Sequence, residues 1–239
     1  MSVYFRQLFA GRDFGASNAV CCQMENFVYL VGDTESRECV VVDPAWAVDE
    51  IVDIAEADGM KVVGGLGTHY HPDHVGGTMM GFNVEGAARL TSRCGCKLHV
   101  HELETPWVRR VTGLAQGDLV QHQSGDHVEV GGLRIEWLHT PGHTPGSSCF
   151  RVRTNDGTDA LIAGDTLFLR GCGRVDLPGG DPDEMYRSLH QRLATLPDTI
   201  ELWPGHAYGG HHASMGSVRR SNPLLRPADL ATWRDLRGV

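Results

Sequence analysis

The segment THYHPDH, residues 68–74, places three histidines and one aspartate within seven positions. A lone histidine is more often a hydrogen-bonded structural residue than a metal ligand, but four ligand-type residues in the spacing HxHxDH favour metal binding. Where such a segment leaves a strand, side chains at positions i and i+2 point the same way. His69 and His71 are therefore predicted to bind one cation together.

The second half of this segment predicts a second cation beside the first. Pro72 fixes its own φ and disfavours helix at the residue before it. Asp73 and His74 are therefore expected on a turned loop, where they can face a neighbouring ion. The segment as a whole indicates two adjacent metal sites.

Three more candidate ligands follow along the chain, each beside a glycine or proline that allows the backbone to approach closely. They are His143 in TPGHTPGSS, Asp165 in LIAGDTLF and His206 in LWPGHAYGG. Asp165 can bridge two ions through its separate carboxylate oxygens, and each ion keeps a position for water, as a catalytic site requires. The first ion is assigned to His69, His71 and His143, and the second to Asp73, His74 and His206.

The order of these motifs resembles a known family. THYHPDH, PGHTPGSS, GDTLF and PGHAYGG occur in this order in the metallo-β-lactamase-fold hydrolases, and within them in the glyoxalase II-like (hydroxyacylglutathione hydrolase-like) and persulfide dioxygenase-like branch. The resemblance covers nearly all of the chain, from FRQLF to SNPLL. It implies an α+β fold, an αββα four-layer sandwich with two sheets face to face, helices outside and the metals at the rim. All seven candidate residues carry over as the family's metal ligands.

Strand and helix signals alternate along the chain. VYFRQLF, FVYLVGD and ECVVVD are rich in β-formers and separated by turn residues, which predicts an antiparallel meander. Apolar residues at helical spacing predict helices in AVDEIVDIAEADGM, with a stop near Gly59, and in PDEMYRSLHQRLATL. The candidate ligands fall on loops at one edge of the sheets. We expect a single domain spanning residues 1–239.

Composition narrows the classes of partner. With 239 residues and 41% hydrophobic residues, the chain can bury a sizeable core. Its net charge of −9 offers no basic field for phosphates, so no nucleic-acid partner is expected. The first residues lack a secretory signal, no apolar run is long enough to cross a membrane, and the seven cysteines show no disulfide spacing. We expect a cytoplasmic protein with a small-molecule substrate and no membrane partner; a homo-oligomer stays open.

The ions suggest the chemistry. A bound metal can lower the pKa of water from about 15.7 to about 7, which supplies hydroxide at neutral pH for attack on an acyl carbonyl. The leading hypothesis is a glyoxalase II-like thioester hydrolase with two divalent ions, zinc first, with iron or mixed zinc and iron as alternatives. Asp73 would also orient the water.

Two further residues are candidates for substrate contact. The resemblance implies that Arg174, in GCGRVDL, lies near the anionic end of the substrate, where an arginine fork suits a carboxylate. The competing interpretation is an ion pair between Arg174 and Asp176. Tyr208 matches a tyrosine that relatives place near the metals, where its hydroxyl could orient a bound ligand.

Other readings of the same residues stay open. A persulfide dioxygenase would hold one iron(II) with His69, His143 and Asp165, leaving positions for oxygen and a glutathione persulfide. A lactonase or ester hydrolase keeps the same ligands, and a non-catalytic metal-buffering module is a further alternative. Glutathione recognition is uncertain because only 33 residues follow His206, whereas glyoxalase II enzymes carry a C-terminal region that binds glutathione.

A second group of ligand-type residues lies in RCGCKLHVHELE, positions 93–104. Cys94, Cys96, His99 and His101 could in principle hold a soft metal. The two histidines share one face of a strand while the two cysteines fall in the turn before it. Ordinary packing roles are therefore the preferred interpretation.

Overall fold

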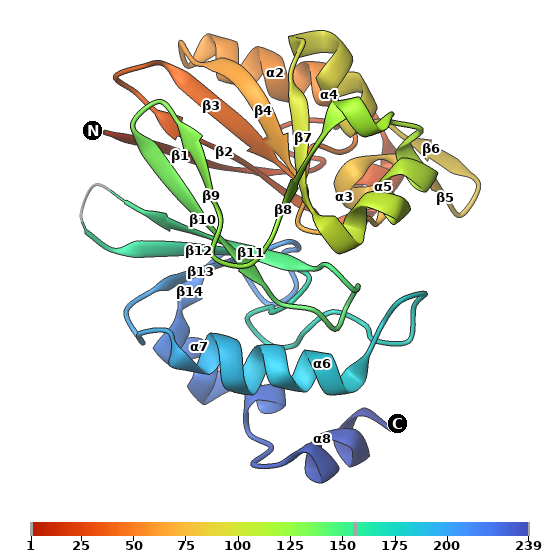
Figure 1. The fold of residues 1–239 in the computed structure, drawn as a ribbon, viewed down its shortest axis with the longest axis vertical. Helices are drawn as coiled ribbons and strands as arrows, with labels where there is room; N and C mark the ends of the chain where they lie inside the picture. The colour runs from red at the N-terminus through yellow and green to blue at the C-terminus, as the bar shows by residue number, and fades with distance from the viewer. Residues whose placement is uncertain (1, 155–156, 239) are drawn as a thin grey trace.

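Two six-stranded β-sheets face each other in the computed structural model, which describes residues 2–154 and 157–238 (Figure 1). The first sheet has the order β1-β2-β3-β4-β7-β8. Its first three strands form the antiparallel meander that the sequence predicts, and the remaining neighbours pair in parallel. The strands are β1 (Val3–Phe9), β2 (Phe27–Asp33), β3 (Glu38–Val42), β4 (Lys61–Leu66), β7 (Lys97–His101) and β8 (Leu119–His122).

The second sheet has the order β14-β13-β12-β11-β10-β9. Only the pair β12 and β13 is parallel among its described strands, so these two strands end at the same edge of the sheet. The strands are β9 (His127–Val130), β10 (Leu133–His139), β11 (Ser148–Arg153), β12 (Asp159–Gly164), β13 (Glu201–Pro204) and β14 (Ala213–Ser214).

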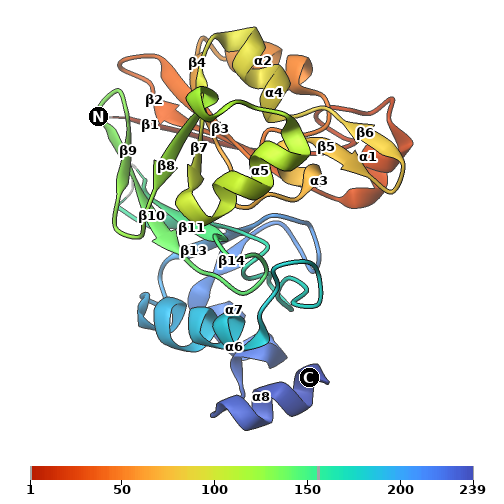
Figure 2. The same cartoon turned by 45° about the vertical axis from the view of Figure 1, so that its right-hand side comes forward.

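Helices cover the outer faces of both sheets, which completes an αββα sandwich (Figure 2). α2 and α4 pack on the first sheet together with the short α1. α6 and α7 pack on the second sheet, and α8 packs against the outer side of α6 (Figure 1). The predicted αββα arrangement of an α+β fold is confirmed. The bounds are α1 (Ala19–Met24), α2 (Val48–Ala57), α4 (Ala87–Cys94), α6 (Pro182–Arg187), α7 (Met215–Ser221) and α8 (Leu230–Arg237).

A smaller unit lies at one side of the first sheet and begins with α3, which contains the end of the ligand segment. It consists of two helices, α3 and α5, and a two-stranded hairpin, β5 and β6 (Figure 1). Its Val75 and Val108 belong to a separate apolar cluster, which also includes Leu98 of β7. The bounds are α3 (Pro72–Val75), β5 (Gly77–Met79), β6 (Phe82–Val84) and α5 (Thr105–Thr112).

The core between the two sheets is aromatic and β-branched. Every residue of β2 is buried, because one face of this strand meets the helices and the other meets the second sheet. Trp137 and Phe150 lie in this inner layer with ring centroids 4.6 Å apart, and the Trp137 indole donates a hydrogen bond to Ser148. This packing holds the two sheets in a fixed relation.

The helix predicted over PDEMYRSLHQRLATL is α-helical only to Arg187. It continues as a π-helix over Ser188–Arg192 and a 3₁₀ turn over Leu193–Thr195. The buried face is nevertheless the predicted one, with Met185, Leu189 and Leu193 in the core. Ser188 donates a hydrogen bond to the carbonyl of Pro141. The widened turn is thus connected to the loop that carries His143.

None of the described helices combines the length and the apolar character that spanning a bilayer requires.

Replacing Phe150 with alanine is expected to lower the free energy of unfolding by about 3–5 kcal/mol, because the ring is fully buried between the sheets. Chemical denaturation followed by circular dichroism measures this loss. Phe82→Ala is the matched control, since Phe82 is 52% exposed on the hairpin and its removal is expected to change stability by no more than about 0.5 kcal/mol. Similar losses in the two variants would contradict the assignment of the core.

Candidate metal centre

The seven predicted ligands lie together at one edge of the sandwich, beyond strand ends. Five of them lie on loops, whereas Asp73 and His74 lie on the short helix α3, so the expectation that a turned loop carries these two residues is wrong. Pro72 begins this helix because the first helical position needs no backbone N–H for an intrahelical bond. Residues 68–74 follow β4, Asp165 follows β12 and His206 follows β13. His143 lies on the loop between β10 and β11. The parallel arrangement of β12 and β13 accounts for the proximity of Asp165 and His206.

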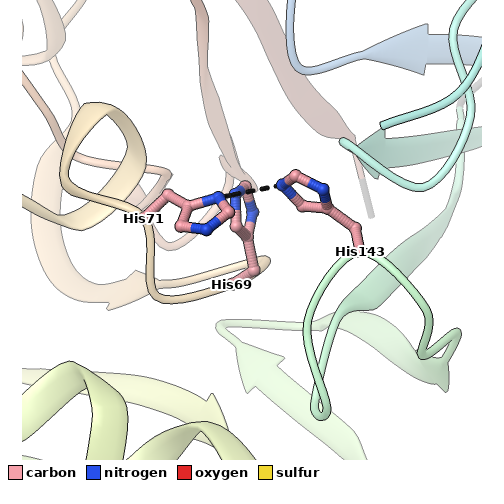
Figure 3. A group of neighbouring side chains, drawn as sticks. All are labelled: His69, His71 and His143. Atoms are coloured by element: carbon pink, nitrogen blue, oxygen red, sulfur yellow. Dashed lines mark hydrogen bonds between the residues drawn. The ribbon is translucent and has the colours of Figure 1, made fainter. Parts of the chain in front are cut away.

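The first group consists of His69, His71 and His143, whose ring nitrogens converge (Figure 3). His71 Nδ1 lies 3.0 Å from His69 Nε2 and 2.9 Å from His143 Nε2. Zinc binds imidazole nitrogen at about 2.0–2.1 Å, so two ligands of a tetrahedral site lie about 3.3 Å apart. The spacing of these three nitrogens fits a common cation.

The second group consists of Asp73, His74 and His206. The Nε2 atoms of the two histidines are 3.2 Å apart, and each lies 3.4 Å from Asp73 Oδ2. All three side chains are buried. The expected division of the ligands into two triads therefore corresponds to two clusters of donor atoms in the structure.

Asp165 lies between the two groups. Its Oδ1 is 3.4 Å from the Nε2 atoms of His74 and His206, while its Oδ2 is 3.6 Å from His143 Nε2. Oδ1 is buried and, within the described part of the chain, has no hydrogen-bond partner. A buried carboxylate oxygen without such a partner is costly unless a cation neutralises it. The residues present therefore fit a pair of divalent ions.

Each histidine of the centre except His71 has its second ring nitrogen held by a neighbour. His143 Nδ1 donates to the carbonyl of Arg174 at 2.7 Å, and His206 Nδ1 donates to the carbonyl of Met24 at 2.8 Å. A nitrogen that faces a carbonyl must carry the proton, so the lone pair of each ring is on Nε2 and faces the centre. These contacts orient the rings for metal binding.

Asp43 supports two further histidines, and sequence reasoning missed it. Its Oδ2 pairs with His74 Nδ1 at 2.8 Å and accepts the hydroxyl of Thr68 at 2.7 Å. Thr68 Oγ1 in turn lies 3.0 Å from His69 Nδ1. One carboxylate therefore orients His74 directly and His69 through a hydroxyl. Its position at the end of the apolar run ECVVVD was the available signal.

Asn26 is the second supporting residue that the sequence did not indicate. Its amide nitrogen lies 3.2 Å from Asp73 Oδ2, and its carbonyl oxygen accepts from the Trp46 indole at 3.1 Å. Asn26 also forms an isolated β-bridge with His206. It precedes β2 in a segment without a recognisable motif, so its role depends on the tertiary fold.

The surroundings of these histidines shift their pKa values in opposite directions. Burial lowers the pKa of His71 to about 4 and also lowers the pKa of His69 and His143, which keeps these rings neutral and available as ligands. Burial acts in the same direction on His74, but Asp73, Asp165 and Asp43 outweigh it and raise the pKa of His74 to about 10. Ligation requires the neutral ring, so metal binding at the second group displaces protons.

Arg174 forms the ion pair that was the competing interpretation. Its guanidinium binds Asp176 through two contacts of 3.0 and 2.7 Å, and the side chains are 67% and 62% exposed. Only its backbone carbonyl contacts the centre, through His143. The side chain therefore lies on the solvent side of the site.

Tyr208 lies at the rim of the second group. Its ring stacks on His206 with centroids 4.7 Å apart and an interplanar angle of 4°, and its residue is 45% exposed. The hydroxyl is 3.5 Å from the Met24 carbonyl. Tyr208 is thus placed beside a candidate ligand and open to solvent.

The ligand-type residues of RCGCKLHVHELE, positions 93–104, are not assembled into a metal site. His99 Nδ1 lies 2.8 Å from His122 Nε2, and His101 stacks on His139 at 3.9 Å. Among the described residues, sets of three potential ligands occur only at the centre already described. The packing interpretation of these residues agrees with the structure.

The chain belongs to the metallo-beta-lactamase superfamily, because the family model matches residues 24–206. The predicted membership is confirmed. Members of this family to which the chain is similar fall into more than one reaction class.

The persulfide dioxygenase ETHE1 of Homo sapiens mitochondria is 34% identical over 202 residues, which is 83% of this chain and 71% of that protein. The hydroxyacylglutathione hydrolase of a Polaromonas strain is 34% identical over 184 residues, which is 77% of this chain and 62% of that protein. The crystal structure of ETHE1 from Myxococcus xanthus superposes with a TM-score of 0.78 and 27% identity, covering 98% of this chain and 90% of that one.

Asp43→Asn is expected to weaken metal binding about 10–100-fold, because an amide cannot replace a carboxylate that orients two histidines. Asparagine tolerates the left-handed backbone of Asp43, which has φ of 56°, so the fold should be kept. Competition with a chromophoric chelator measures the affinity. Asp53→Asn, on the exposed face of α2, is the control and should bind as the unaltered protein does; an unchanged affinity in Asp43→Asn would contradict the role of Asp43.

Proposed function

We propose that this chain is a metal-dependent hydrolase that cleaves a thioester, and that residues 1–239 act as one domain. The observation that carries the proposal is the position of Asp165, whose two oxygens face two different donor groups. A carboxylate shared in this way is suited to two ions rather than one. The proposed ligands are the seven residues His69, His71, Asp73, His74, His143, Asp165 and His206.

The donor set decides which ions are suitable. Five imidazoles and two carboxylates suit zinc or iron, and no thiolate takes part. We propose two zinc ions, with iron or a mixed zinc and iron pair as the alternatives. When bound, such ions supply Lewis acidity to a carbonyl oxygen and make a neighbouring water acidic enough to ionise near pH 7.

The protein's own groups would position the reactants. Asp73 is the carboxylate proposed to orient the attacking water, and the amide of Asn26 fixes one of its oxygens. The hydroxyl of Tyr208, at the exposed rim, is proposed to orient the bound substrate. Phe168 packs edge-on against the rings of Tyr208 and His206, and so limits their movement.

Arg174 is proposed to bind the anionic end of the substrate. Its ion pair with Asp176 is exposed, and exposed pairs contribute only about 0–1 kcal/mol. A substrate carboxylate can therefore replace Asp176 at little cost, and the guanidinium fork can bind it through two hydrogen bonds. Asp176 would then tune the affinity by competing for the same arginine.

A persulfide dioxygenase is the second candidate function. It is favoured by the similarity to ETHE1, which extends over most of both chains. In this case one iron would be held by His69, His143 and Asp165. The complete second group of Asp73, His74 and His206, with its own supporting contacts, favours the hydrolase.

Two assays on one purified sample distinguish the candidates. The hydrolase predicts two metal ions per chain by elemental analysis and release of free thiol from a thioester. Asp165→Asn should lower this hydrolysis on the order of 10³-fold, because loss of a shared ligand removes several kcal/mol of transition-state stabilisation. Asp53→Asn is the control on the surface. One iron per chain with oxygen uptake on glutathione persulfide, and no thioester cleavage, would reject the hydrolase in favour of the dioxygenase.

Arg174→Ala is expected to raise KM about 10–100-fold with little change in kcat, since a charge-assisted hydrogen bond contributes about 1.5–3 kcal/mol. The variant keeps the backbone carbonyl that orients His143, so its metal content should not change. Asp176→Asn should lower KM because it frees the guanidinium. Steady-state kinetics on an anionic thioester test both variants, and an unchanged KM in Arg174→Ala would remove Arg174 from the substrate site.

A further inference from the structure

A buried glutamate lies where two ligand-carrying segments meet, and the proposed reaction does not use it. Glu104 ends the 3₁₀ turn Glu102–Glu104 that follows β7, and its exposed fraction is 0%. On one side is the loop that carries His143. On the other side is Tyr70, the residue between His69 and His71.

The carboxylate of Glu104 is bonded to the part of the loop that directly follows His143. Its Oε1 accepts a hydrogen bond from Thr144 Oγ1 at 2.7 Å and one from the backbone amide of Gly146 at 2.6 Å. The backbone amide of Tyr70 also acts on the carboxylate and lowers the pKa of Glu104. Three donors from two separate segments therefore favour the ionised form of one side chain.

The loop fits closely around Glu104. A Cβ on Gly146 would lie 2.7 Å from Glu104 Cγ, so only glycine allows this approach. Thr144 Oγ1 also contacts Ser147 Oγ at 2.7 Å, and the carbonyl of Pro145 lies 2.9 Å from His139 Nε2. The loop is fixed on both sides of His143.

Keeping this carboxylate buried has a cost. Burial raises the pKa of Glu104 to about 7 against the effect of its three donors. Its Oε2 is buried and lacks a hydrogen bond of normal geometry to any described residue. A buried, incompletely satisfied carboxylate costs free energy, and such groups are often retained for a functional reason.

We propose that Glu104 is a positioning residue for the first metal site. By holding the loop that carries His143 through Thr144 and Gly146, it sets the position of His143 relative to His69 and His71. The second triad has other supports. Asn26 and the Met24 carbonyl serve this triad, and Asp43 orients His74 while also reaching His69 through Thr68. None of these contacts involves Glu104. This inference rests on the proposed metal centre and not on the reaction that the centre performs.

The test measures zinc affinity at each site separately, in the full-length chain. His206→Ala removes a ligand of the second site and leaves the first triad, while His71→Ala does the reverse. In the His206→Ala background, Glu104→Gln should weaken zinc binding about 10–100-fold, the usual effect of losing a contact that orients a ligand. In the His71→Ala background it should change affinity less than about twofold.

Two readouts besides activity report the effect. Competition of zinc with a chromophoric chelator at pH 8 gives the dissociation constants, and the absorption spectrum of the cobalt(II) form reports the geometry of the remaining site. Glu102→Gln is the matched control, because Glu102 is exposed on the same turn and its carboxylate accepts a hydrogen bond from the side chain of Gln123, away from the His143 loop. This control should leave both constants unchanged.

Each outcome decides the question. Equal loss at both sites, or no loss at the first, overturns the role of Glu104 while leaving the metal centre intact. Absence of zinc binding in the unaltered protein overturns the metal centre and Glu104's role with it. If circular dichroism shows Glu104→Gln to be unfolded, Thr144→Val removes one of the three donors and should produce a smaller loss confined to the first site.

Discussion

The metal centre depends on the close contact of the two sheets at Thr68 and Gly164. Gly164 has φ of 47°, and a Cβ there would lie 2.6 Å from Thr68 Oγ1, so glycine alone permits the approach. Backbone hydrogen bonds cross between the sheets beside it, from Ser148 to the Thr68 carbonyl and from Phe27 to the Gly205 carbonyl. Ligands from the first sheet thereby reach Asp165 from the second. Any separation of the sheets here would part the two halves of the site.

Local patterns explain what the sequence could predict. The strands of the opening meander and α2 follow from residue periodicity, because neighbouring residues determine them. The seven predicted ligands follow from motifs: four lie within THYHPDH, and the other three, His143, Asp165 and His206, each follow a glycine. Asn26 and Glu104 could not be predicted in this way, because their partners are distant in the sequence: Asn26 bonds Asp73, 47 positions away, and Glu104 bonds Thr144, 40 positions away. The π-helical turn at Ser188 likewise depends on a tertiary contact, with Pro141.

The supports of the second triad bear on the choice between two reactions. A site that is left empty has no need for contacts that fix its ligands. Here each member of the triad has one: Asp43 for His74, the Met24 carbonyl for His206 and Asn26 for Asp73. These contacts orient donor atoms toward a common point at the cost of burying polar groups. Their presence supports the proposed occupation of both sites.

The histidines of the centre differ in the charge of the group that supports them, and this difference has a chemical consequence. His143 and His206 are held by neutral carbonyls, whereas Asp43 gives His74 a charged partner and reaches His69 through Thr68. A carboxylate partner makes an imidazole a stronger donor than a carbonyl does. Because Asp43 acts on one histidine of each triad, it couples the two sites, while Glu104 acts on the first alone. In the proposed two-ion centre, a change at Asp43 would therefore alter both triads, whereas a change at Glu104 or Asn26 would alter only one.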